Sequence, residues 1–188
     1  MHLKSVLTGA GAAIAARALL PKLLVVKFGR DVRRLNAGDY STLLRAYADD
    51  AVLHFAEGEH RWSGDWVGKA AIERFLKNFT AAKVQGKLRQ VAVSGPPWAL
   101  MIWARFDDFV NAADGTPLYE NRTVLVMRTR WGKIVDHEDF YADTARIAEL
   151  DHKLTALGVA PVPKPTTMPS PSSSTQRPLA GPLREGNA

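Results

Sequence analysis

The clearest structural signal in this chain of 188 residues is the stretch LYENRTVLVMRTRWGKIVDHEDFY, residues 118–141. Apolar and polar side chains alternate along it, and β-branched and aromatic residues are frequent, which is typical of strands. Trp131-Gly132 lies in the middle, where a two-residue turn would fold the stretch back on itself. We therefore predict an antiparallel hairpin with strands over residues 118–130 and 133–141.

The regions outside this hairpin extend the sheet and add helices. The alternating segments 87–93 and 98–109 predict two further strands, and residues 51–55 predict a short one. Apolar residues at helical spacing predict four helices: one over 21–35, one over 40–47, one that follows Lys69, and one over 142–157. This order predicts an α+β fold with the helices on one face of a curved antiparallel sheet.

The two ends of the chain differ from this core in composition. Residues 159–188 hold seven of the eleven prolines together with four serines, and such a segment buries too little apolar surface to order itself. We predict one domain over 21–158 and a disordered Pro/Ser-rich tail over 159–188. Residues 1–20 are predicted to form an N-terminal helical extension, with a targeting segment as the alternative. The expected location is the cytoplasm, and export is the alternative.

Composition excludes several kinds of chemistry. The chain has no cysteine, which excludes disulfides, thiolate metal sites and cysteine nucleophiles. It also lacks the HExxH metal motif, the glycine-rich dinucleotide-binding motif and the P-loop motif. We therefore expect neither a metal nor an organic cofactor.

The net charge of +6 is carried by the ends of the chain. Residues 1–36 contain seven Lys or Arg against one Asp, and residues 159–188 contain three against one Glu, so residues 37–158 carry −2. A nucleic-acid-binding domain carries its positive charge on the domain itself. We therefore expect no nucleic-acid partner, and at most a weak contact between the basic N-terminal helix and an anionic membrane surface.

Strand alternation predicts which side chains face a ligand pocket. One face of strand 98–109 carries Trp103, Arg105 and Asp107. Each strand of the hairpin has one face that is mostly apolar with a few polar groups, as the walls of ligand pockets are. The polar groups on these faces are Asn121, His137 and Asp139. Three more residues are predicted to line the pocket, one each from the first strand, the segment after it and the third helix: His54, Trp62 and Phe75.

The predicted pocket could carry acid/base chemistry. An arginine between two carboxylates on an apolar surface can separate their pKa values, so that one acts as acid and the other as base. The alternative is that Arg105 and Asp107 form an ordinary ion pair near a strand end. His137 is then a hydrogen-bonded core histidine.

Four short motifs resemble the SnoaL-like branch of the nuclear-transport-factor-2-like (NTF2-like) superfamily: Leu35–Tyr40, Ala48–Val52, Gly132–Val135 and Asp139–Asp143. The resemblance covers about residues 22–157 and implies a cystatin-like cone, in which a bent antiparallel sheet wraps around helices and encloses an apolar pocket. Members of this superfamily include ketosteroid isomerases, polyketide cyclases and limonene epoxide hydrolases, so the fold alone leaves the reaction open. The resemblance also implies a homodimer.

The limonene epoxide hydrolases offer the most detailed likeness. They use an Arg-x-Asp on one strand and a Gly-Lys-Ile-x-x-x-x-Asp segment on the last, which match Arg105–Asp107 and Gly132–Asp139 here. By this resemblance Asp139 is the general base, Asp107 the general acid and Arg105 the bridge between them. The Tyr and Asn that hold the attacking water in those enzymes are replaced here by Leu53 and Phe55, which weakens the hydrolase assignment.

Taken together, these features predict a cofactor-independent acid/base enzyme, a hydrolase, isomerase or cyclase, that acts on a small hydrophobic molecule of terpenoid, steroid or polyketide type. The alternative is a module that binds a hydrophobic ligand without transforming it or that serves mainly to dimerise.

Overall fold

The computed structural model describes residues 23–164. Residues 23–36 are helical. The elements that follow, in chain order, are α2 (Ser41–Ala46), β1 (Tyr47–Phe55), β2 (Gly64–Val67), α3 (Lys69–Ala81), β3 (Gln85–Ser94), β4 (Met101–Asn111), β5 (Pro117–Arg130), β6 (Lys133–Tyr141) and α4 (Ala145–Ala156).

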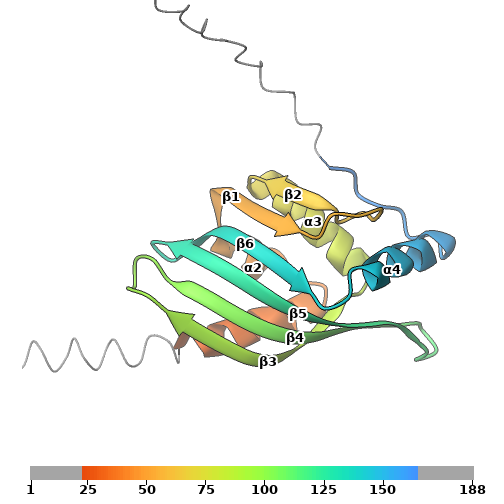
Figure 1. The fold of residues 1–188 in the computed structure, drawn as a ribbon, viewed down its shortest axis with the longest axis horizontal. Coiled ribbons are helices and arrows are strands. Elements are labelled where there is room, and N and C mark those ends of the chain that lie inside the picture. Colours follow the sequence, from red (N-terminus) through yellow and green to blue (C-terminus); the bar gives the residue numbers. More distant parts are fainter. Residues whose placement is uncertain (1–22, 165–188) are drawn as a thin grey trace, which may run out of the picture.

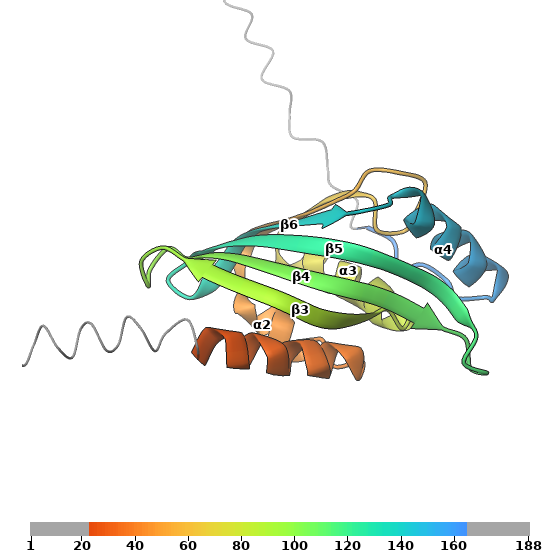
Figure 2. The ribbon, with the colours of Figure 1, turned by 60° about the horizontal axis from the view of Figure 1, so that its bottom comes forward.

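The six strands form one curved sheet in the order β2-β1-β6-β5-β4-β3. Neighbouring strands are antiparallel except β1 and β6, which run parallel. The helix over 23–36 and α3 lie against the concave side of the sheet, while the other side of β3–β6 is uncovered (Figures 1 and 2). This is the α+β cone that the sequence predicts.

The predicted hairpin is confirmed. Strands β5 and β6 pair from Thr123↔Tyr141 to Arg130↔Lys133, and Trp131 and Gly132 both have positive φ, 50° and 77°. Two successive residues with positive φ form the turn that matches the twist of paired strands.

The β1–β2 region differs from the sequence prediction. Strand β1 begins at Tyr47, which the sequence analysis placed at the end of a helix. Residues 64–67 form a strand that the sequence analysis did not predict. Pairing explains both differences. Tyr47 lies opposite Ile134 of β6, and Phe55 and Leu53 lie opposite Gly64 and Trp66 in an antiparallel ladder. Such a short strand has little periodicity of its own and is stabilised by its partner.

The hydrophobic core lies between α3 and the concave face of the sheet. Its largest fully buried side chains include Tyr47, Trp62, Trp66 and Ile72. Trp62 packs against Phe55 and the α3–sheet core, with 6.5 Å between those two ring centroids.

The start of the predicted disordered tail is ordered. Residues 159–164 lie along α3, where the buried Asn78 side chain accepts a hydrogen bond from the N–H of Val162 (2.7 Å) and donates one to its carbonyl (2.9 Å). The Nζ atom of Lys164 lies 4.7 Å from the ring centre of Trp66. A composition rule could not find this segment, because its order comes from one amide side chain that pairs with its backbone.

Several predictions concern residues outside the described part of the chain, namely the extension or targeting segment over 1–20 and the rest of the tail. Within residues 23–164, no helix is long and apolar enough to cross a membrane.

Candidate functional site

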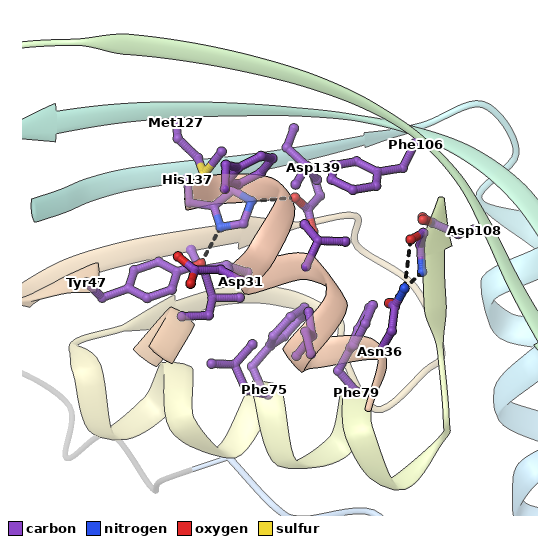
Figure 3. Close-up of a pocket in the computed structure, with 18 of the residues that line it drawn as sticks. Asp31, Asn36, Tyr47, Phe75, Phe79, Phe106, Asp108, Met127, His137 and Asp139 are labelled. Atoms are coloured by element: carbon purple, nitrogen blue, oxygen red, sulfur yellow. Dashed lines mark hydrogen bonds and ion pairs between the residues drawn. The ribbon is translucent and has the colours of Figure 1, made fainter. Parts of the chain in front are cut away.

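A cavity of about 80 Å³ lies between the helix over 23–36, α3 and the concave face of the sheet. Most of its wall is apolar and includes Phe28, Phe75, Phe79 and Phe106. The polar side chains in the wall come from the helix over 23–36 and from strands β1, β4 and β6, and they are Asp31, Asn36, Tyr47, Asp108, His137, Asp139 and Tyr141 (Figure 3).

Strand β6 brings two of these groups together. His137 and Asp139 are two residues apart, so both point to the same face of the sheet. The Nε2 atom of His137 lies 2.8 Å from Oδ1 of Asp139, and both side chains are buried. Despite this distance, Oδ1 of Asp139 has no hydrogen-bond partner within the described part of the chain. The ring N–H of His137 is therefore not well aligned with this oxygen.

Tyr47 completes a chain of three polar groups. Its hydroxyl oxygen lies 2.5 Å from Nδ1 of His137. Burial, followed by the negative charge of Asp139, raises the pKa of Tyr47 well above its ordinary value. The hydroxyl therefore stays protonated and donates a hydrogen bond to Nδ1 of His137. Nε2 then carries the ring proton on the side of Asp139, an assignment that follows from the hydrogen-bond network.

Asp108 supplies a second carboxyl group to the cavity. It accepts a hydrogen bond from the hydroxyl of Thr123 and is buried. Burial raises its pKa to about 7, the Thr123 hydrogen bond opposes this rise, and the charges of Asp139 and Asp107 add to it. Near neutral pH this carboxyl group is therefore protonated about half of the time.

A glycine makes room for Asp108. A Cβ atom on Gly86 would lie 3.0 Å from the ring of Phe106 and 3.1 Å from Oδ1 of Asp108. The Asn36 side chain pairs with the backbone of Gly86 through two hydrogen bonds of 3.0 Å, one donated and one accepted. Asn36 thus holds Gly86 at the edge of the cavity, and the Asp108 carboxyl group beside this glycine faces the cavity.

Three of the sequence-predicted site residues line this cavity: Asp139, His137 and Phe75. Asp139 and His137 are placed there by the alternation of β6, as predicted. Phe75 lies on the apolar face of α3.

The predicted face of β4 is wrong. The buried positions on this strand are Ala104, Phe106, Asp108 and Val110, which share a face with Ile102, whereas Trp103, Arg105 and Asp107 point to the opposite face. Asp107 pairs there with Arg89, 2.6 Å away. The physical reason is that the face containing Ile102, Ala104 and Phe106 buries more apolar surface than the face containing two charged residues and one tryptophan. This feature of the sequence could have identified Asp108.

The other predicted lining residues also lie elsewhere. His54 is on the outer face of β1 and pairs with Asp65 at 2.8 Å. Trp62 is a core residue that does not line the cavity. Asn121 has the predicted orientation on β5, but its amide donates to the carbonyl of Asp143 at 2.6 Å and it borders a separate depression.

That depression is open and charged. Its volume is about 750 Å³, and it is bordered by Arg105, Asp107 and Asn121 among others. Asp108 also borders it, so this side chain lies between the depression and the apolar cavity. Charged side chains in open solvent interact weakly, so we regard the apolar cavity as the candidate site.

Sequence reasoning missed five polar side chains of the cavity: Asp31, Asn36, Tyr47, Asp108 and Tyr141. No group of three or more His, Asp or Glu side chains within residues 23–164 has an arrangement that could hold a metal ion.

Comparison with known proteins places the chain in a family. The SnoaL-like domain model matches residues 30–137, and the chain therefore belongs to the SnoaL-like domain family. No protein of curated function matches it.

Solved structures share the fold at low sequence identity. Bal32a, from a soil-derived mobile gene cassette, is 18% identical, with a TM-score of 0.55 over 68% of this chain and 95% of that one. An NTF2-like protein from Burkholderia pseudomallei is 22% identical, with a TM-score of 0.55 over 64% and 91%. TerC, co-crystallised with polyporic acid, is 19% identical, with a TM-score of 0.51 over 65% and 92%. These similarities establish the NTF2-like, cystatin-like fold.

Proposed function

We propose that this protein is a cofactor-independent acid/base enzyme of the isomerase type, which acts on a small carbonyl compound in the apolar cavity. Asp139 is the base and Asp108 the acid. The observation that carries the proposal is that two buried carboxyl groups line one apolar cavity in different surroundings, one beside an imidazole and one with its pKa raised to about 7.

The proposed reaction needs only these groups. The Asp139 carboxylate removes a proton from the carbon next to the carbonyl, and the electron pair of the broken C–H bond moves to the carbonyl oxygen. The protonated Asp108 donates a hydrogen bond to that oxygen as its charge develops. When the substrate is a β,γ-unsaturated ketone, the negative charge also spreads to the γ-carbon. Asp139 then returns the proton to that carbon, so the double bond shifts and no atom is gained or lost.

His137 and Tyr47 have a positioning role in this proposal. Nε2 of His137 lies 2.8 Å from Oδ1 of Asp139, and the Tyr47 hydroxyl fixes the orientation of the imidazole ring. A base whose orientation is fixed before the substrate arrives avoids reorganisation during the reaction.

The epoxide-hydrolase version of the prediction has less support. It requires Arg105 and Asp107 on the same face as Asp139, whereas both border the open depression. The cavity volume of about 80 Å³ also favours a compact substrate over a steroid-sized one. A non-catalytic ligand-binding module remains the second candidate, because the same apolar cavity would serve it.

We also propose a homodimer that forms through the outer face of the sheet. Trp103, Val124 and Phe140 lie on adjacent strands of this face and are 37%, 40% and 49% exposed. Exposed apolar side chains that cluster on one face are typical of an interface. Sedimentation equilibrium of Trp103→Lys against the wild type tests this proposal, because a lysine there would favour the monomer.

Hydrogen exchange tests the proposed reaction directly. The wild type is incubated in D₂O with a panel of small ketones and enones, and loss of the α-proton signal is followed by NMR. We expect Asp139→Asn to reduce exchange by about 100-fold or more, and the rate to fall as the pH rises past about 7, because Asp108 then loses its proton.

Asp136→Asn is the matched control, because Asp136 lies on the same strand and pairs with Arg128 on the outer face, at 3.3 Å. Equal exchange rates in Asp139→Asn and Asp136→Asn would overturn the proposal. Ligand binding without any exchange in the wild type would favour the binding module.

A further inference from the structure

The charged side chains that line the cavity are unbalanced in sign. Three carboxyl groups face it, from the helix over 23–36, from β4 and from β6: Asp31, Asp108 and Asp139 (Figure 3). They are 8%, 7% and 9% exposed. Among the described residues that line this cavity there is no lysine and no arginine. Buried carboxylates are costly unless a cation or hydrogen-bond donors compensate them.

The compensation within the protein is incomplete. Asp31 pairs at 2.6 Å with Lys27, whose side chain is 55% exposed at the surface, and Asp108 accepts a hydrogen bond from Thr123. Oδ1 of Asp139 is the remaining case. It is buried and faces the misaligned ring of His137 at 2.8 Å, and within residues 23–164 no donor satisfies it. A buried acceptor of this kind is stabilised by an N–H donor inside the cavity.

Aromatic rings form much of the remaining wall. Six of the lining residues are aromatic: Phe28, Tyr47, Phe75, Phe79, Phe106 and Tyr141. The face of an aromatic ring attracts a cation, and this attraction grows when water is excluded. Aromatic faces and carboxylates both attract a positively charged ligand. They repel an anionic ligand, and they attract a neutral polar ligand less strongly than a cation.

From these features we infer that the cavity binds a small organic ammonium ion, whose N–H groups donate to Oδ1 of Asp139 and whose apolar part lies among the aromatic rings. This inference goes beyond the proposed function, because an ammonium ion that engages Asp139 would compete with the carbonyl substrate for the same cavity. The requirement for an N–H donor predicts that a primary ammonium binds better than a quaternary one. The cavity volume of about 80 Å³ predicts a compact molecule.

Titration calorimetry with four small aromatic ligands tests the inference. Benzylamine is a cation at pH 7, benzyl alcohol is neutral and benzoate is an anion. We expect benzylamine to bind at least about 10-fold more tightly than benzyl alcohol, benzyltrimethylammonium to bind less tightly than benzylamine, and benzoate not to bind. These differences correspond to the loss of one charge-assisted hydrogen bond or more.

Proton release gives a second, independent measurement. A bound cation favours the ionised form of Asp108, whose pKa lies at about 7, so benzylamine should release up to about half a proton at pH 7. Calorimetry in two buffers of different ionisation enthalpy measures this number. Asp108→Asn should abolish the release, whereas Asp107→Asn, on the opposite face of the same strand, should leave it unchanged.

The variants at Asp139 decide the assignment. Asp139→Asn should lower the affinity for benzylamine by about 10-fold or more and leave that for benzyl alcohol unchanged, while Asp136→Asn should affect neither. Equal affinities for benzylamine and benzyl alcohol, or no binding of either, would overturn the inference. Because the measurement involves no turnover, exchange of a neutral ketone would leave the proposed function standing even when the ammonium preference fails.

Discussion

Asp107 and Asp108 are consecutive residues of β4 with the same side chain, yet they lie in opposite surroundings. Asp107 points to the outer face of the sheet and pairs with Arg89 at 2.6 Å. Asp108 points to the concave face, accepts a hydrogen bond from Thr123 and borders the apolar cavity. The difference shows that the period-2 geometry of a strand, and not the residue type, determines which carboxyl group can take part in chemistry.

The same contrast extends along the strand. Arg105 shares the outer face with Asp107, and Phe106 shares the concave face with Asp108. On the outer face Arg105 is exposed, and the half-buried Asp107 is paired with Arg89. The concave face is a low-dielectric surface where an isolated carboxyl group retains its proton.

The largest expected effect comes from the apolar side of the comparison. Phe106 is buried and packs edge-to-face against Phe28, with ring centroids 6.1 Å apart. Phe106→Ala should lower the free energy of unfolding by about 3–4 kcal/mol, because it removes buried surface and leaves a cavity. Arg105→Ala, one residue away on the other face, should change it by about 0.5 kcal/mol or less. Urea unfolding followed by tryptophan fluorescence measures both, and similar losses would refute the assigned faces.

An intermediate effect concerns the pH dependence of stability. In the unfolded chain Asp108 loses its proton near the ordinary value of 3.8, whereas in the folded protein its pKa is about 7. Between these values the folded state binds more protons, so the free energy of unfolding falls as the pH rises. The contribution of Asp108 should amount to about 2 kcal/mol between pH 5 and pH 7.

The substitution Asp108→Asn should remove this slope, and Asp107→Asn should retain it. Urea titrations at pH 5, 6 and 7 of the three proteins provide the test. An unchanged slope in Asp108→Asn would mean that another group causes it.

The smallest expected effect is that of the outer ion pair. Arg89 and Asp107 are partly exposed, so a double-mutant cycle with Arg89→Ala and Asp107→Ala should give a coupling energy of about 0.5 kcal/mol. High salt should reduce this coupling further. A coupling energy several times larger would show that the outer face is less solvated than its exposure indicates, as burial in a dimer interface would make it.

Part of the site follows from the sequence alone. The alternation of residues 118–141 and the positive-φ turn at Trp131-Gly132 predict the β5–β6 hairpin. Within that hairpin the spacing of His137 and Asp139 places both on one face. These features depend on local backbone geometry, which is why neighbouring residues suffice to predict them.

The tertiary structure decided the rest. Either face of β4 carries an aspartate. The apolar residues beside Asp108 favour the inward direction of this side chain, and packing against the helix over 23–36 and α3 places it in the cavity. Tyr47 reaches His137 because β1 pairs in parallel with β6, a contact between residues 90 positions apart in the chain.

The tail and the cavity illustrate the same limit. The order of residues 159–164 depends on Asn78, which is 84 positions away from Val162. The raised pKa of Asp108 depends mainly on how much water the packed elements exclude. The sequence by itself therefore determined the fold class and the hairpin, because both depend on local periodicity. It also showed that acid/base residues are present. Only the tertiary structure decided which carboxyl groups share a dry cavity, because burial is a property of surfaces brought together from distant parts of the chain.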